Sequence, residues 1–169
     1  MIFITTVFLI MSLLIQTITS NYLGYTYQSL SPFITLYLLI ALLMIKPYFE
    51  NDKKYLLTLL IAGFLSGITY TNAVFLNISL FFVAYCFTKF FHFYFPYNYL
   101  TINISTLIGI FLYHILSFLF LITIGYDKYP FHMLLQILLD SIPMTILYTT
   151  VSYFLLETIF HHFSLRKIK

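Results

Sequence analysis

An aspartate inside a long apolar segment is the residue of this sequence with the clearest chemical potential. Asp140 lies about one-third of the way into an apolar run that starts at Phe131. An acid at such a depth in a membrane helix costs about 2.5–3.5 kcal/mol, so we expect it to be protonated, paired or hydrated. Gln136 lies one helical turn earlier and is placed to form a hydrogen bond with it. Pro143 should kink the helix and free a backbone carbonyl nearby. Asp140 therefore has either a functional role or a structural one.

A second set of polar residues falls within the preceding apolar run. Asn103, Thr106, His114 and Ser117 follow one another at steps of 3, 8 and 3 residues. On a helix this spacing keeps them near one face, which we expect to turn inward. Such a face either lines a path for protons or solutes, or it forms hydrogen bonds that join neighbouring helices. One histidine with three weak dipoles favours the second interpretation.

Other kinds of chemistry find no support in the residue pattern. His161 and His162 are adjacent, so on a helix they point about 100° apart and chelate a metal ion poorly. The sequence contains no Ser-His-Asp arrangement, no glycine-rich phosphate loop and no paired carboxylates. We therefore predict a protein that is not an enzyme and that has no catalytic residues, metal site or cofactor.

The composition indicates where these residues must work. Hydrophobic residues make up 62% of the chain and charged residues 8%, against roughly 25% charged in a typical soluble domain. A chain of this kind uses the bilayer as its solvent. The longest polar gaps, 46–54 and 92–103, are too short to bury a core. Residues 1–169 are thus expected to form a single integral membrane domain of the cell membrane.

A membrane crossing needs about 20 mostly apolar residues, and six apolar segments can be drawn as candidate crossings. They cover about residues 2–19, 32–45, 55–69, 73–91, 104–124 and 131–160. The third and fourth would be too long for a roughly 30 Å hydrocarbon core if they were one helix, so a tight turn near residues 70–72 is expected. The first segment lacks a basic region before it, and we expect it to remain as an uncleaved anchor.

The basic residues give the orientation of these segments. If the amino terminus is cytoplasmic and six segments alternate, seven of the eight basic residues lie inside and only Lys128 lies outside. The seven are Lys46, Lys53, Lys54, Lys89, Arg166, Lys167 and Lys169. This distribution obeys the positive-inside rule. It predicts an all-α, polytopic protein with six transmembrane helices and both termini in the cytoplasm. The net charge of +3 then indicates contact with membrane lipid, not with nucleic acid.

Small residues mark one face of the third segment. Gly63 and Gly67 are four residues apart, next to Ala62 and Ser66. Such a stripe lets two helix backbones approach closely. It packs against a neighbouring helix of the same chain, or it docks the transmembrane helix of a partner. The sequence leaves both alternatives open.

Two asparagines follow this stripe. Asn72 suits the turn between the third and fourth segments. Asn77 lies one turn deeper in the fourth segment, where its amide needs a hydrogen-bond partner on another helix. Interhelical bonding is the favoured interpretation of Asn77, and a substrate contact is the alternative.

The run GFLSGITYTNAVFLN, residues 63–77, resembles the rod shape-determining MreD family of low-GC Gram-positive bacteria. Members have a glycine-led helix, a tyrosine-threonine-asparagine turn, and phenylalanine-leucine-asparagine at the start of the next span. The segment 141–153, with Tyr148 and Tyr153 spaced along it, is similar to the last helix of that family. Length, six spans and a short basic tail fit as well. Many relatives carry an aspartate where this chain has Gly67, so any role of that acid does not transfer.

The resemblance implies a non-enzymatic scaffold of the bacterial cell-elongation machinery. Its partners would be an MreC-like bitopic membrane protein and, indirectly, the actin-like MreB filament, an elongation polymerase and a class B penicillin-binding protein. Polar and small stripes would hold the transmembrane helices of partners. The candidate partner-binding residues on this interpretation are Gly63, Gly67, Tyr70, Asn72 and Asn77.

Two other functions compete with the scaffold. Substrate-binding subunits of energy-coupling-factor vitamin transporters also have six short spans, but typically with an alanine-rich first helix. The first segment here, from Ile2 to Leu9, contains no alanine. The third hypothesis is a small membrane enzyme or a proton-coupled carrier built around Asp140 and His114.

Overall fold

Helices make up almost all of the chain that the computed structural model describes, which is residues 2–22, 36–49, 51–71, 74–125 and 130–162. No β-strand occurs in these ranges. The helices are α1 (Ile2–Tyr22), α2 (Tyr37–Ile45), α3 (Asp52–Ser66), α4 (Val74–Tyr94), α5 (Tyr99–Thr123) and α6 (Phe131–His162). A 3₁₀ turn, Lys46–Tyr48, follows α2, and a π-helical turn, Gly67–Thr71, extends α3. The predicted all-α class is confirmed.

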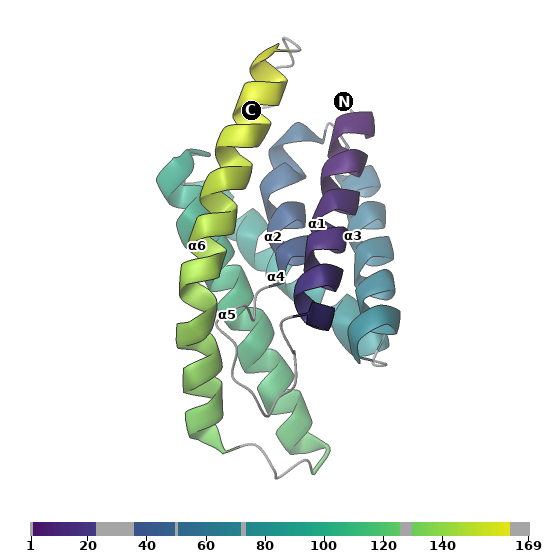
Figure 1. Cartoon of the computed structure of the whole chain (residues 1–169), viewed down its shortest axis with the longest axis vertical. Coiled ribbons are helices and arrows are strands. Elements are labelled where there is room, and N and C mark those ends of the chain that lie inside the picture. Colours follow the sequence, from purple (N-terminus) through teal and green to yellow (C-terminus); the bar gives the residue numbers. More distant parts are fainter. Residues whose placement is uncertain (1, 23–35, 50, 72–73, 126–129, 163–169) are drawn as a thin grey trace.

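Successive helices run in opposite directions. The beginning of α1 and the end of α6 therefore lie at the same end of the bundle (Figure 1). Contacts between helices show the same alternation. Residues near the start of α3 face the end of α4, and residues near the start of α5 face the second half of α6. This arrangement is the one that six alternating segments require.

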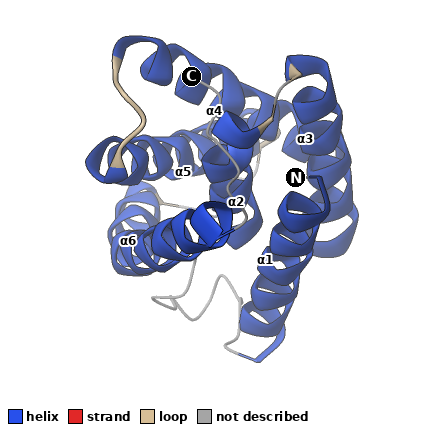
Figure 2. Cartoon of the chain, turned by 90° about the horizontal axis from the view of Figure 1, so that it is seen from above, coloured by secondary structure: helices blue, strands red, loops and turns tan. Residues whose placement is uncertain are grey.

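The second helix forms the centre of the bundle. Viewed from above, α2 lies among the other helices (Figure 2), and every residue of Tyr37–Ile45 is at most 5% exposed. A helix that is apolar on all sides is stable only when it is surrounded in this way. The predicted segment 32–45 and helix α2 end at the same residue, Ile45. The first residues of that segment, 32–35, lie outside the described part of the chain.

Among the described residues, three helices are long and apolar enough to cross a membrane. They are Val74–Tyr94, Tyr99–Thr123 and the part of α6 up to Phe160. Shorter apolar helices cover Ile4–Thr19 and Tyr37–Tyr48. The outward faces of the long helices carry large apolar side chains, such as Phe75 and Leu139, as lipid contact requires. The chain is therefore a helical membrane protein.

The structure divides the third and fourth predicted segments as expected. Helices α3 and α4 are separate and antiparallel, since Gly63 lies beside Ile78 and Gly67 beside Val74. The next helix starts earlier than predicted, at Tyr99 instead of residue 104. Asn98 causes this early start by forming a capping box with Thr101, with bonds of 2.9 and 3.0 Å.

An ion pair joins the ends of the α3–α4 hairpin at the predicted cytoplasmic side. Lys89 Nζ lies 3.0 Å from Asp52 Oδ2, and both side chains are more than half exposed. The hydrogen bond from Lys89 lowers the pKa of Asp52 below its usual value of 3.8. Because the pair is exposed, we expect it to contribute less than about 1 kcal/mol.

This pair predicts a small pH dependence of stability. A carboxylate whose pKa is lowered by folding stabilises the protein above its unfolded pKa, and this contribution is lost as the pH falls through the folded pKa. We expect Lys89→Met to lower the melting temperature slightly at pH 7, with the difference from the parent protein disappearing as the pH falls below 3.8. Melting curves of both proteins in detergent from pH 7 to pH 3 measure this. A difference that stays constant over this range would contradict the assignment.

Candidate functional site

Polar side chains lie where the helices meet, although the outer faces of the bundle are apolar. Ser12 on α1 and Tyr148 on α6 share a hydrogen bond of 2.7 Å between their hydroxyl oxygens. The hydroxyl oxygens of Thr106 on α5 and Thr149 on α6 lie 3.2 Å apart and share a second hydrogen bond. A polar group in a dry membrane interior is costly unless it is paired, so these bonds fix which faces of the helices meet.

The central helix is held by side chains from three of its neighbours. Gln16 on α1 accepts a hydrogen bond from the backbone N–H of Leu38 at 3.0 Å. The N-cap residue Leu36 provides no side-chain bond, so Gln16 satisfies a donor that the helix start leaves open. Tyr55 on α3 donates to the carbonyl of Leu42 at 2.8 Å. Tyr97, between α4 and α5, donates to the carbonyl of Met44.

The glycine stripe packs within the chain. A methyl group added at Gly67 would lie 2.6 Å from the Cα of Val74, and one added at Gly63 would lie 3.1 Å from the Cα of Ile78. Both glycines thus let the backbones of α3 and α4 approach closely. The sequence left a partner helix as an alternative occupant of this stripe. In the structure α4 occupies it, so we do not retain Gly63 and Gly67 as a docking face for a partner.

The other candidate partner-binding residues, Tyr70, Asn72 and Asn77, lie in different parts of the structure. The backbone of Tyr70 belongs to the π-helical turn at the end of α3. Asn72 lies outside the described residues. Asn77 is buried on α4, and its Oδ1 accepts a hydrogen bond of 2.5 Å from the hydroxyl of Tyr113 on α5. The interhelical bond predicted for Asn77 is therefore present.

The polar face predicted for α5 turns toward its neighbours, but its members do not form one site. Asn103 donates from Nδ2 to the carbonyl of Tyr99, one turn earlier, at 3.0 Å. Thr106 bonds to α6, as described above. His114 and Ser117 line a small cavity farther along, and the buried Nε2 of His114 makes no hydrogen bond with the part of the chain that the structure describes. Solute or proton passage along the whole face is thus not supported by a continuous set of polar contacts.

Asp140 lies half-buried on α6, which continues as a helix through Pro143. Gln136 is exposed, and no hydrogen bond joins it to Asp140 in the described structure. The predicted pairing of these two residues is wrong. The turns of α6 around Gln136 present this amide outward, although a one-turn spacing allows such a bond.

A stripe of small hydroxyl residues on α6 was not predicted from the sequence. Ser141, Thr145, Thr149 and Ser152 are each at most 3% exposed and lie three or four residues apart. They turn one face of α6 toward the bundle, together with Thr5, Ser12 and Gln16 of α1. The regular spacing of Ser and Thr was the available signal. It is weak, because these hydroxyls also bond to carbonyls of their own helix, as Thr149 does at 2.7 Å to Thr145.

The polar contacts described above join helices or bond to the backbone of their own helix. Within the described ranges no group of three or more His, Cys, Asp or Glu residues is placed to hold a metal ion. Comparison with protein-family models, curated proteins and solved structures finds no match to this chain. The geometry of the polar interfaces and the sequence resemblance are therefore the grounds for a functional proposal.

Proposed function

We propose that this chain is a multi-pass membrane scaffold of the bacterial cell-elongation machinery, which regulates cell shape by binding the transmembrane helices of its partners. In this proposal all six helices cross the cell membrane, and both ends of the chain lie in the cytoplasm. The chain supplies no chemistry of its own. Its partners are an MreC-like bitopic protein and, through it, the MreB filament, the elongation polymerase and a class B penicillin-binding protein.

The observation that carries this proposal is the α3–α4 hairpin. Its sequence, residues 63–77, is the run that resembles the MreD family. Three distinctive residues of the run have a packing or bonding role, whereas Phe75 is exposed on the outer face. Gly63 and Gly67 bring two backbones together, and Asn77 binds α5. A motif used in this way supports a protein whose task is to hold helices in a fixed arrangement.

The polar interfaces support the same conclusion. Most of the buried hydroxyl and amide groups of α1, α2, α5 and α6 bond across helices or to their own backbone, so few are left to bind a solute. The large apolar side chains on the outer faces are available to lipid or to partner helices. A rigid core with an apolar exterior suits a scaffold that binds within the membrane.

Restoration of rod shape tests the proposal. We expect expression of this chain to restore rods in a low-GC Gram-positive bacterium depleted of its own MreD-family protein. We also expect an MreC-like bitopic protein to co-purify with it from such cells. The variant Gly67→Ala should fail in both assays, because the added methyl group meets the backbone of α4.

Gly109→Ala is the matched control. Its added methyl group would lie 2.8 Å from the end of the flexible Leu43 side chain and in ordinary contact with Thr88 Cγ2 at 3.9 Å, with no backbone atom in the way, so this variant should restore rods as the parent does. Cells that remain round although the parent protein is inserted at normal levels would overturn the proposal. Tight binding of a vitamin by the purified protein would instead favour the transporter subunit.

A further inference from the structure

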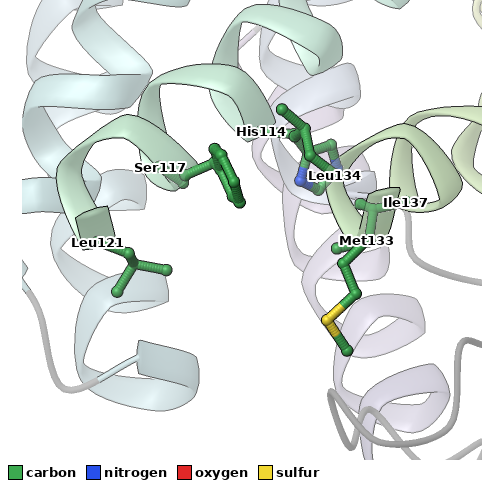
Figure 3. Close-up of a pocket in the computed structure, with 7 residues that line it drawn as sticks. His114, Ser117, Leu121, Met133, Leu134 and Ile137 are labelled. Carbon is green, nitrogen blue, oxygen red and sulfur yellow. The ribbon is translucent and has the colours of Figure 1, made fainter. Parts of the chain in front are cut away.

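A small cavity lies between the second half of α5 and the first two turns of α6 (Figure 3). Its volume is about 50 Å³. Two polar residues, His114 and Ser117, contribute to its wall. The other lining residues are apolar: Phe118, Leu121, Met133, Leu134 and Ile137. The cavity thus brings polar groups and a small open volume together in an otherwise apolar region.

One ring nitrogen of His114 has no hydrogen-bond partner among the described residues. Its Nε2 atom is buried and forms no hydrogen bond with the described residues. A neutral imidazole has one donor nitrogen and one acceptor nitrogen, and a buried polar atom left unpaired costs about 1–3 kcal/mol. The cavity is the space beside this ring from which a hydrogen-bonding partner can reach it.

The size of the cavity decides which partner fits. Sites for drug-sized molecules have volumes of about 300–1,000 Å³. A water molecule needs about 10–15 Å³ measured in this way, so a few waters fill a cavity of 50 Å³. Apolar cavities remain dry, but polar ones with partners for two or more hydrogen bonds hold water. The unpaired Nε2 atom of His114 is such a partner, and Ser117 is a second polar residue in the wall of the cavity.

We propose that this cavity is a hydrated inlet, in which a cluster of waters solvates the His114 imidazole within the membrane. On the proposed topology the inlet opens to the outer side, because α5 ends and α6 begins there. The direction of entry rests on that topology, and the hydration does not. The inlet gives His114 contact with water that the neighbouring lipid-facing residues of α6 lack.

Labelling of single cysteines with a charged, membrane-impermeant methanethiosulfonate tests the inlet. The native Cys86 is first replaced by alanine, and Ser117→Cys, Ile137→Cys and the control Leu139→Cys are then made separately. The reagent reacts with thiolate, which forms readily in water and poorly in lipid. Leu139 is 66% exposed on the lipid side of α6, two residues beyond Ile137. We expect both cavity cysteines to react at least about tenfold faster than the control.

Reagent is added to either side of sealed vesicles, and labelling in denaturant confirms that each thiol is present. Reaction of the cavity cysteines from the outer side supports both the inlet and the topology. Reaction only from the cytoplasmic side supports the inlet and contradicts the topology. If neither cavity cysteine reacts faster than Leu139→Cys from either side, the inlet is wrong.

A second variant tests the part played by the imidazole. Adding His114→Leu to Ser117→Cys makes the cavity apolar without enlarging the side chain beyond its present space. We expect labelling to fall to the rate of the Leu139→Cys control, because an apolar cavity stays dry. An unchanged rate would overturn the role of His114 in holding the water.

Discussion

Replacing Gly67 with alanine should destabilise the protein more than the same change at Gly63 or Gly109. The new Cβ would lie 2.6 Å from the Cα of Val74, a distance that real Cβ atoms do not adopt. Because the obstructing atom belongs to the backbone, no side-chain rotation relieves the clash, and α3 and α4 must separate. We expect a loss of about 3 kcal/mol or more, at the top of the range for overpacked interiors. Thermal unfolding in detergent should show a melting temperature lower by about 6–12 °C.

Two other glycines provide matched comparisons for this change. Gly63→Ala brings a Cβ to 3.1 Å from the Cα of Ile78, so its effect should be intermediate. Gly109→Ala meets Leu43 Cδ1 at 2.8 Å, and that side chain can change rotamer at a cost of about 1 kcal/mol. Equal melting temperatures for the Gly67 and Gly109 variants would show that the backbones of α3 and α4 do not meet as described.

The second large effect is expected at Tyr55, which is fully buried between α2, α3 and α4. Its ring packs against those of Phe49 and Tyr85, with centroids 5.4 and 5.1 Å away, and its hydroxyl bonds to Leu42. Tyr55→Ala removes the ring and leaves a cavity, so we expect a loss of about 3–5 kcal/mol in the free energy of unfolding. Unfolding in a series of denaturing detergent mixtures measures this loss.

Tyr55→Phe separates the hydrogen bond from the packing. It keeps the ring and removes only the bond to the Leu42 carbonyl, which is expected to cost about 0.6–1.7 kcal/mol, as for other bonds inside membrane proteins. If the phenylalanine variant were as unstable as the alanine variant, the hydroxyl would dominate and the aromatic packing would be a minor contribution.

The sequence predicted the helices well because length and charge constrain them strongly. The run from Tyr55 to Phe91 is too long for one crossing, and Lys89 fits the inside only if the run is divided. The structure contains that division. The bond of Asn77 was predictable for a similar reason, because an amide in a dry interior must find a partner.

The pairing of particular faces was not predictable, since it depends on how each helix is rotated in the bundle. Gln136 and Asp140 are one turn apart, yet the packing of α6 leaves Gln136 exposed. The glycine stripe suits any close helix, and only the folded hairpin shows that α4 occupies it. The Ser and Thr residues of α1 and α6 gave little signal, because a hydroxyl satisfied by its own helix is tolerated on any face.

The location of the two ends of the chain tests most directly the claim that six helices cross the membrane. Green fluorescent protein and alkaline phosphatase are fused in turn to each terminus and inserted in turn into residues 23–35 and 126–129. We predict fluorescence without phosphatase activity at both termini, and phosphatase activity at both internal sites. Signals placing the two termini in opposite compartments would mean an odd number of crossings, and the proposed topology and scaffold geometry would then be wrong.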